Sequence, residues 1–282
     1  MSGMAQFRDR LGVCSWSLQP SSPRELAERM KAVGLSRVQL ALDPLRLEPA
    51  VWGDAAQVLG RAGIEIVSGM FGCEGEDYST LESIRRTGGV VPDATWDRNW
   101  ANAQATAELA GRLGVKTVTF HAGFLPHDPQ DPSFGKLVGR VRQIARCFAT
   151  RGIVLNCETG QETAPALKAF LEHLNEPNVG VNFDPANMIL YGNGDPVPAL
   201  RMVGKWVKGV HVKDAVATKT PGTWGTEVVV GTGEVNWKAF FSTLAEIGFG
   251  GWLCLEREAG SQRVEDLRAG YRFARETLSA LG

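Results

Sequence analysis

Four strand-like segments in the second half of the chain end on side chains that could bind a metal or move a proton. The segments are IVLNCE, VGVNFD, WVKGVHVKD and WLCLERE, and they carry Glu158, Asp184, His211 and Glu256. Carboxylates and an imidazole do not belong in a dry core unless they are paired or coordinated. Together they form an oxygen-rich set with one nitrogen. Such a set predicts one divalent metal ion, with Mn²⁺, Mg²⁺ or Co²⁺ favoured and Zn²⁺ as the remaining candidate.

The metal interpretation depends on the four residues as a group, because any single carboxylate at a strand end is more often a surface residue. Three ionised carboxylates around a dication leave about one net negative charge, so a cation is expected beside them. Lys213, at the end of the same segment as His211, is the main candidate, and Arg257 is the alternative.

Three further residues are candidates for the same site. His121 lies near the end of another strand-like run, VKTVTFHAG. This placement suits a metal ligand, but His121 could equally hydrogen-bond a ligand of the metal or a substrate. Trp16 ends the first strand-like run, LGVCSW, where it forms an apolar wall of the pocket or packs in the core. Trp224 lies in a long loop after His211, and it either closes over a substrate or remains on the surface.

The whole chain alternates between strand-like and helix-like segments. Eight strand signals are each followed by a helical segment; they are LGVCSW, SRVQLAL, IEIVSGMF, VKTVTFHAG, IVLNCE, VGVNFD, WVKGVHVKD and GWLCLERE. Such alternation requires parallel strands with crossover helices, and eight units close into a (β/α)8 TIM barrel. The carboxyl ends of all eight strands then lie at one face, where residues that are distant in sequence converge.

One domain spanning residues 1–282 is expected, since this length is typical of one α/β barrel and no linker or exact repeat interrupts the chain. The alternative is an open doubly wound sheet. It is disfavoured because the segment after the first strand, SWSLQPSSP, lacks the glycine-rich phosphate fingerprint of that fold. Two connections, residues 71–93 and 215–235, are longer than ordinary loops, which is typical of segments with a function.

Composition excludes several classes of function. The chain has 30 Lys and Arg against 31 Asp and Glu and no basic block, so binding to nucleic acid is disfavoured. No apolar run reaches the length of a signal peptide or a membrane span, which predicts a cytoplasmic protein with no membrane partner. The five cysteines show no CxxC spacing, so buried free thiols are expected rather than disulfides or a zinc-thiolate site.

The segments NCE, NFDPANM, GVHVKD, GTGEVNW and LEREAG, in this order and at strand ends, resemble a known family. They are similar to the sugar phosphate isomerases and epimerases among the xylose-isomerase-like barrels, which include D-tagatose 3-epimerases and inosose dehydratases. The resemblance covers residues 11–281. It implies that Glu158, Asp184, His211 and Glu256 bind the metal, and that Glu158 and Glu256 face each other across the substrate as catalytic acid and base.

The sequence departs from the ketose 3-epimerases at two points. Those enzymes carry a substrate-binding His three residues after the metal-binding Asp, and Asn187 stands at that position here. They also carry an Arg after the metal-binding His, where this chain offers only Lys213 and Lys219. These departures leave the reaction on the substrate open.

The resemblance implies a metal-dependent isomerase or epimerase of a keto sugar or polyol. The reaction passes through a metal-stabilised enediolate, with His121, Lys213, Asn187 and Trp16 around a small carbohydrate substrate. Two alternatives remain: a lyase or dehydratase acting on a keto-inositol or 3-keto-glycoside, and a non-catalytic, metal-containing subunit that binds sugars. Related barrels commonly form homodimers, but no feature of this sequence requires one.

Overall fold

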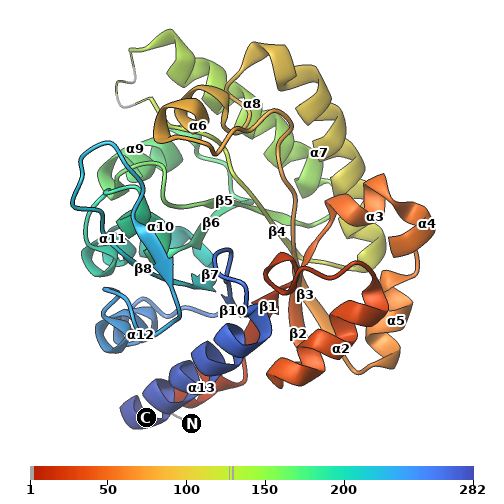
Figure 1. Cartoon of the computed structure of the whole chain (residues 1–282). Helices are drawn as coiled ribbons and strands as arrows, with labels where there is room; N and C mark the ends of the chain where they lie inside the picture. The colour runs from red at the N-terminus through yellow and green to blue at the C-terminus, as the bar shows by residue number, and fades with distance from the viewer. Residues whose placement is uncertain (1–2, 127, 129) are drawn as a thin grey trace.

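The computed structural model describes residues 3–126, 128 and 130–282 of the chain. Eight parallel strands form a closed barrel, and helices surround it (Figure 1). Around the ring the order is β1, β10, β7, β6, β5, β4, β3, β2, so that β1 pairs with β2 on one side and β10 on the other. The strands are β1 (Leu11–Cys14), β2 (Arg37–Ala41), β3 (Glu65–Met70), β4 (Thr117–Phe120), β5 (Val154–Glu158), β6 (Val179–Phe183), β7 (Val207–Val212) and β10 (Trp252–Leu255). The TIM barrel predicted from the sequence is confirmed.

Helices follow the strands and cover the outside of the barrel. They are α1 (Gly3–Arg8), α2 (Pro23–Val33), α3 (Asp43–Leu47), α4 (Pro49–Trp52), α5 (Ala55–Arg61), α6 (Leu81–Thr87), α7 (Asp93–Leu113), α8 (Pro132–Ala149), α9 (Ala164–Leu174), α10 (Pro185–Leu190), α11 (Pro196–Val203), α12 (Trp237–Glu246) and α13 (Arg263–Leu281). Two short 3₁₀ turns are η1 (Ser15–Leu18) and η2 (Gly204–Trp206). Helix α1 packs against α13, which brings the two ends of the chain together (Figure 1).

Local signals in the sequence set the helix ends. Helix α2 begins where the Ser22 side chain accepts a hydrogen bond from the backbone of Glu25, and it ends at Gly34, whose φ of 91° suits glycine. The apolar faces of these helices and strands form the core between the two layers. None of the helices in the described part of the chain is long and apolar enough to cross a membrane.

The inside of the barrel is polar below the carboxyl ends of the strands. One small cavity there is lined by amide, hydroxyl and thiol side chains, among them Gln39, Ser68, Thr119, Asn156, Asn182 and Cys254. Each of these six side chains is buried. A polar layer at this depth differs from the branched apolar layers usual inside such barrels, and it lies directly beneath the site described below.

The long connection after β7 folds into a two-stranded antiparallel hairpin, β8 (Asp214–Val216) and β9 (Thr226–Val228). The buried carboxylate of Asp214 holds this connection together. It accepts hydrogen bonds from the backbone N–H groups of Ala215, Gly231, Gly233 and Val235 and from Trp237 Nε1. Asp214 belongs to the same sequence segment as His211 and Lys213, WVKGVHVKD, but it begins β8, and its contacts are structural.

Candidate metal centre and substrate pocket

The four side chains predicted to bind a metal meet at the carboxyl end of the barrel. Glu158 ends β5, Asp184 follows β6, His211 lies in β7 and Glu256 follows β10. All four are at least 94 % buried, and one ligand atom of each lies within 4.8 Å of the corresponding atom of the other three. Neighbouring strands thus bring together residues that are up to 98 positions apart in sequence, from Glu158 to Glu256.

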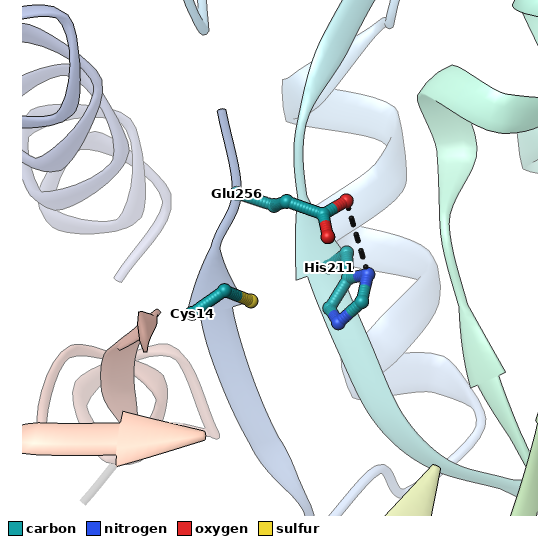
Figure 2. Close-up of side chains that lie close together, drawn as sticks. All are labelled: Cys14, His211 and Glu256. Carbon is teal, nitrogen blue, oxygen red and sulfur yellow. Dashed lines mark ion pairs between the residues drawn. The ribbon is translucent and has the colours of Figure 1, made fainter. Parts of the chain in front are cut away.

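His211 is the centre of this group. Its Nδ1 lies 3.1 Å from Glu158 Oε1, 3.3 Å from Glu256 Oε2 and 3.7 Å from Asp184 Oδ2. Figure 2 shows the contact between His211 and Glu256. Burial alone would lower the pKa of His211, but the negative charges of Glu256 and Glu158 raise it well above its ordinary value. One atom of the imidazole therefore faces three carboxylates, which is the charge pattern that a cation would satisfy.

Three carboxylate oxygens of the group show that a metal ion fits there. Glu158 Oε2, Asp184 Oδ2 and Glu256 Oε2 are buried, and they find no hydrogen-bond donor of suitable geometry among the residues that the structure describes. Burial raises the pKa of Asp184 to about 6, even though Lys213 lowers it. Buried carboxylate oxygens without donors are costly unless an ion or a proton compensates them. A divalent cation held by these residues would do so.

Gln39, in β2, fixes the other side of the His211 ring. Its Oε1 lies 2.7 Å from His211 Nε2, and its Nε2 donates to Thr119 Oγ1 at 3.2 Å. An amide oxygen can only accept, so Nε2 of His211 carries a proton and Nδ1 is the nitrogen left to face the carboxylates. Sequence reasoning missed Gln39; its only signal is a polar residue inside the apolar segment RVQLA.

Lys213 supplies the cation that the sequence predicts beside the acidic group. Its buried Nζ lies 2.6 Å from Glu258 Oε2, 3.0 Å from Glu256 Oε2 and 3.2 Å from Asn187 Oδ1. Burial would lower the pKa of Lys213, but the charges of Glu256 and Glu258 raise it well above its ordinary value. Glu258 was missed from the sequence, although it follows Glu256 by two residues, which in extended chain places both on one side.

Arg257, the alternative cation, is used elsewhere. Its Nη1 bonds to Glu227 Oε1 and its Nε to Asp266 Oδ2, each at 2.9 Å. It therefore fixes the connection before α13 against the hairpin, and Lys213 is the cation in contact with the predicted ligands.

The four residues expected around the substrate also lie at this site. Asn187 Nδ2 donates to Glu158 Oε1 at 3.1 Å, and His121 Nε2 lies 3.7 Å from Glu158 Oε2. Trp16 lies on η1 rather than in a strand, because β1 ends at Cys14. Its Nε1 donates to Glu256 Oε1 at 2.7 Å, so it orients a carboxylate instead of only forming an apolar wall.

A cavity of about 290 Å³ opens above the candidate metal centre. Its lining combines polar and apolar side chains. The polar ones are His121, Glu158, Asn187, Lys213, Glu227, Glu256 and Glu258. The aromatic and apolar ones are Met70, Tyr78, Leu190, Tyr191 and Trp224. Trp224, on the hairpin loop, packs edge-on against Tyr191 with ring centroids 4.8 Å apart. A lining of aromatic and polar side chains suits a ligand with both C–H faces and hydroxyl groups.

Comparisons with known proteins agree with the fold. A xylose isomerase domain protein from Planctomyces limnophilus is 32 % identical, with 90 % of this chain and 92 % of that one covered and a TM-score of 0.80. Two other solved structures are 17 % identical. One is a xylose isomerase-like TIM barrel protein from Mycobacterium smegmatis in complex with magnesium, with 100 % of both chains covered and a TM-score of 0.72. The other is an L-ribulose 3-epimerase, with 96 % and 95 % covered and a TM-score of 0.74.

One relative found by sequence is named for a dehydratase reaction rather than for an epimerase reaction. The inosose dehydratase of Geobacillus kaustophilus (strain HTA426) is 25 % identical over 230 residues, which cover 71 % of this chain and 70 % of the relative.

The closed barrel, with its pocket at the carboxyl ends of the strands, has the (β/α)8 fold, and the proteins similar to it include an L-ribulose 3-epimerase and an inosose dehydratase. The model of the family described as "Xylose isomerase-like TIM barrel" matches residues 27–277, and the chain belongs to that family.

Proposed function

We propose that this protein is a divalent-metal-dependent isomerase or epimerase of a keto sugar or related polyol. One observation carries the proposal: Glu158 and Glu256 both contact His211 Nδ1, both line the same cavity, and each has one buried oxygen that makes no hydrogen bond of suitable geometry within the described chain. Two carboxylates at one small cavity can remove a proton from a substrate carbon and return one elsewhere.

The metal would be held by Glu158, Asp184, His211 and Glu256. Mn²⁺ is the first ion to test, because carboxylate oxygens with one imidazole suit Mn²⁺ and Mg²⁺. When bound, a dication supplies electron withdrawal from a substrate carbonyl, which makes the neighbouring C–H proton more acidic.

The protein side chains would then move the proton. One of Glu158 and Glu256 accepts it as a carboxylate, and the other, which enters the step as a carboxylic acid, returns its own proton to the resulting enediolate. Exchange with solvent then restores the starting protonation of both glutamates. Lys213 is held as a cation by its acidic neighbours, and with His121 it can donate hydrogen bonds to substrate oxygens at the cavity wall. Asn187 and Trp16 hold the two glutamates in place from either side.

A second candidate is a lyase that removes water from a keto-inositol or a 3-keto-glycoside. The curated inosose dehydratase relative favours it, and so does Asn187 at a position where ketose 3-epimerases carry a histidine. Proton removal beside a carbonyl is common to both reactions, and the position of the leaving hydroxyl decides between them. We further propose one catalytic domain over residues 1–282, acting on a small carbohydrate in the cytoplasm.

The experiment follows exchange of substrate hydrogen with solvent. Ketoses, inososes and 3-keto-glycosides are incubated in deuterium oxide with Mn²⁺ and the parent protein, and deuterium uptake is read by NMR. Glu158→Gln and Glu256→Gln should each reduce exchange by at least about 100-fold, since each removes one proton carrier. Glu234→Gln is the matched control, because Glu234 is exposed and bonds to the backbone of Ala217.

The outcomes separate the candidates. Exchange at the parent rate in either glutamine variant would refute the two-carboxylate scheme. A conjugated, ultraviolet-absorbing product would assign the lyase reaction. Saccharide binding without deuterium uptake from any candidate would indicate the non-catalytic sugar-binding subunit.

A further inference from the structure

Cys14, which the proposed reaction does not use, lies beside the candidate metal centre. It is the last residue of β1 and is fully buried. Figure 2 shows its sulfur directed from β1 toward His211 and Glu256. Its Sγ, a ring nitrogen of His211 and a carboxylate oxygen of Glu256 all lie within 4.8 Å of one another. A thiol, an imidazole and a carboxylate therefore converge on one point inside the barrel.

This second group differs chemically from the first. Glu158, Asp184, His211 and Glu256 offer three carboxylates and one nitrogen, a set that suits hard ions such as Mg²⁺ and Mn²⁺. Sulfur, nitrogen and one oxygen suit Zn²⁺ and softer dications, and three protein ligands leave a fourth position open. A thiolate and one carboxylate also balance the two positive charges of such an ion.

We propose that Cys14, His211 and Glu256 form a second binding site for a thiophilic dication of the Zn²⁺ and Cd²⁺ class. The two sites share His211 and Glu256, so one molecule can hold a hard ion or a soft ion, but not both. A soft ion bound to Glu256 occupies one of the two proposed proton carriers. The expected result is a form of the protein that holds metal and is inactive.

Binding of the soft ion exchanges the Cys14 S–H bond for a sulfur–metal bond. The Cys14 thiol donates a weak hydrogen bond to Gln39 Oε1 at 3.4 Å. When the sulfur–metal bond forms, the S–H bond breaks and its proton leaves to solvent. Gln39 loses this donor and keeps its bond to His211 Nε2. No oxidant or other reactant takes part.

Cys254 provides a matched control. It is 3 % exposed, lies in the neighbouring strand β10, and packs in the same small buried cluster as Cys14 and Val67. Within the described residues it belongs to no group of three or more potential ligands. Replacing Cys254 therefore removes a buried thiol that packs near Cys14 but keeps all three proposed ligands.

The test is a titration of the metal-free protein with Cd²⁺, followed by the ultraviolet charge-transfer absorption of a cadmium–thiolate bond. The parent should show a saturable band at one equivalent. Cys14→Ser, which retains the four other cysteines, should lose this band or bind Cd²⁺ at least tenfold more weakly. Cys254→Ser should keep it. Thermal unfolding of each variant confirms that both are folded.

A second measurement separates this inference from the proposed function. Mn²⁺ binding is followed by electron paramagnetic resonance, and Cd²⁺ should release Mn²⁺ from the parent at least tenfold more effectively than from Cys14→Ser. No thiolate band in the parent, or a band that survives in Cys14→Ser, would refute the second site while leaving Mn²⁺ binding intact. A parent that gives the band but never binds Mn²⁺ would support the second site and refute the proposed function.

Discussion

Glu162, in the loop after β5, is a buried carboxyl group that no proposed step uses. Its Oε1 has no hydrogen-bond partner in the part of the chain that the structure describes. Burial raises the pKa of Glu162 to about 8, although a backbone contact at Gly160 lowers it. Near neutral pH the folded protein therefore keeps a proton on this group, whereas the unfolded chain releases it.

We expect Glu162→Gln to stabilise the protein increasingly as pH rises. Between the ordinary pKa of a glutamate and about 8, the folded parent binds one more proton than the unfolded parent. Its unfolding free energy therefore falls by up to about 1.4 kcal/mol per pH unit from this group. The glutamine does not titrate, so the difference between variant and parent should grow across this window in urea unfolding experiments.

Glu28→Gln serves as the control, because Glu28 is exposed on α2. Its effect on the unfolding free energy should be small, because the side chain lies at the surface. A difference between Glu162→Gln and the parent that does not change with pH would show that the group is ionised in the folded protein.

The predicted ligands were found from sequence because each ends or follows an apolar strand, and the carboxyl ends of parallel strands meet. Gln39 and Glu258 were missed for a physical reason. The role of Gln39 depends on a bond across the barrel to His211, and that of Glu258 on the direction in which Lys213 turns. The spacing of Glu256 and Glu258 places both on one side of an extended chain, but it does not predict the contact with Lys213, and a single Gln in an apolar strand does not predict the contact with His211.

At the scale of elements, the hairpin formed by β8 and β9 depends on one buried carboxylate. Four backbone N–H groups and one indole N–H converge on Asp214. The approach is so close that a Cβ added at Gly233 would lie 2.2 Å from Asp214 Oδ1. This arrangement fixes the connection that carries Trp224 to the cavity.

We expect Asp214→Ala to reduce stability by about 3–5 kcal/mol, because it leaves several buried donors without an acceptor. Substrate binding should weaken as well, since Trp224 loses its support. Urea unfolding measures the first effect and saccharide titration the second.

Asp195→Ala is the comparison for this change. Asp195 is an exposed residue whose side chain accepts a hydrogen bond from the backbone of Val197 at the start of α11, so its loss should cost about 1 kcal/mol. Equal effects of the two substitutions would mean that Asp214 only caps a local turn.

Much of the element order was predictable, because continuous apolar runs of strand length alternate with amphipathic segments. The short elements were not. The turn η1 interrupts the apolar segment LGVCSW, and its side chains contact other strands: Ser15 Oγ accepts from the Ala41 backbone and Trp16 donates to Glu256. The hairpin pairs only three residues on each strand, which is too short for a clear strand signal in the sequence.

At the scale of the whole molecule, an ion at the candidate centre would connect four neighbouring strands, β5, β6, β7 and β10. We expect Mn²⁺ to raise the unfolding free energy of the metal-free protein, by about 2.7 kcal/mol when its free concentration is 100 times the dissociation constant. A chelator should reverse the effect. Thermal unfolding at several Mn²⁺ concentrations measures it.

Asp184→Asn tests whether the response comes from this centre. An asparagine oxygen can still accept the bonds that Asp184 Oδ1 receives from the backbone of Ala186 and Asn187 at the start of α10. The variant should keep the helix cap and lose most of the Mn²⁺ response. A response equal to that of the parent would place the ion elsewhere.

The two halves of the barrel contribute unequally to the cavity. Met70, Tyr78 and His121 are the lining residues from the first half, and all the others lie at or beyond Glu158. A library for altered sugar preference therefore belongs in the second half. Residues 154–258 could also be transplanted into a related barrel. The transplanted segment would supply most of the residues that line the cavity, and the first four strands of the recipient would supply the rest.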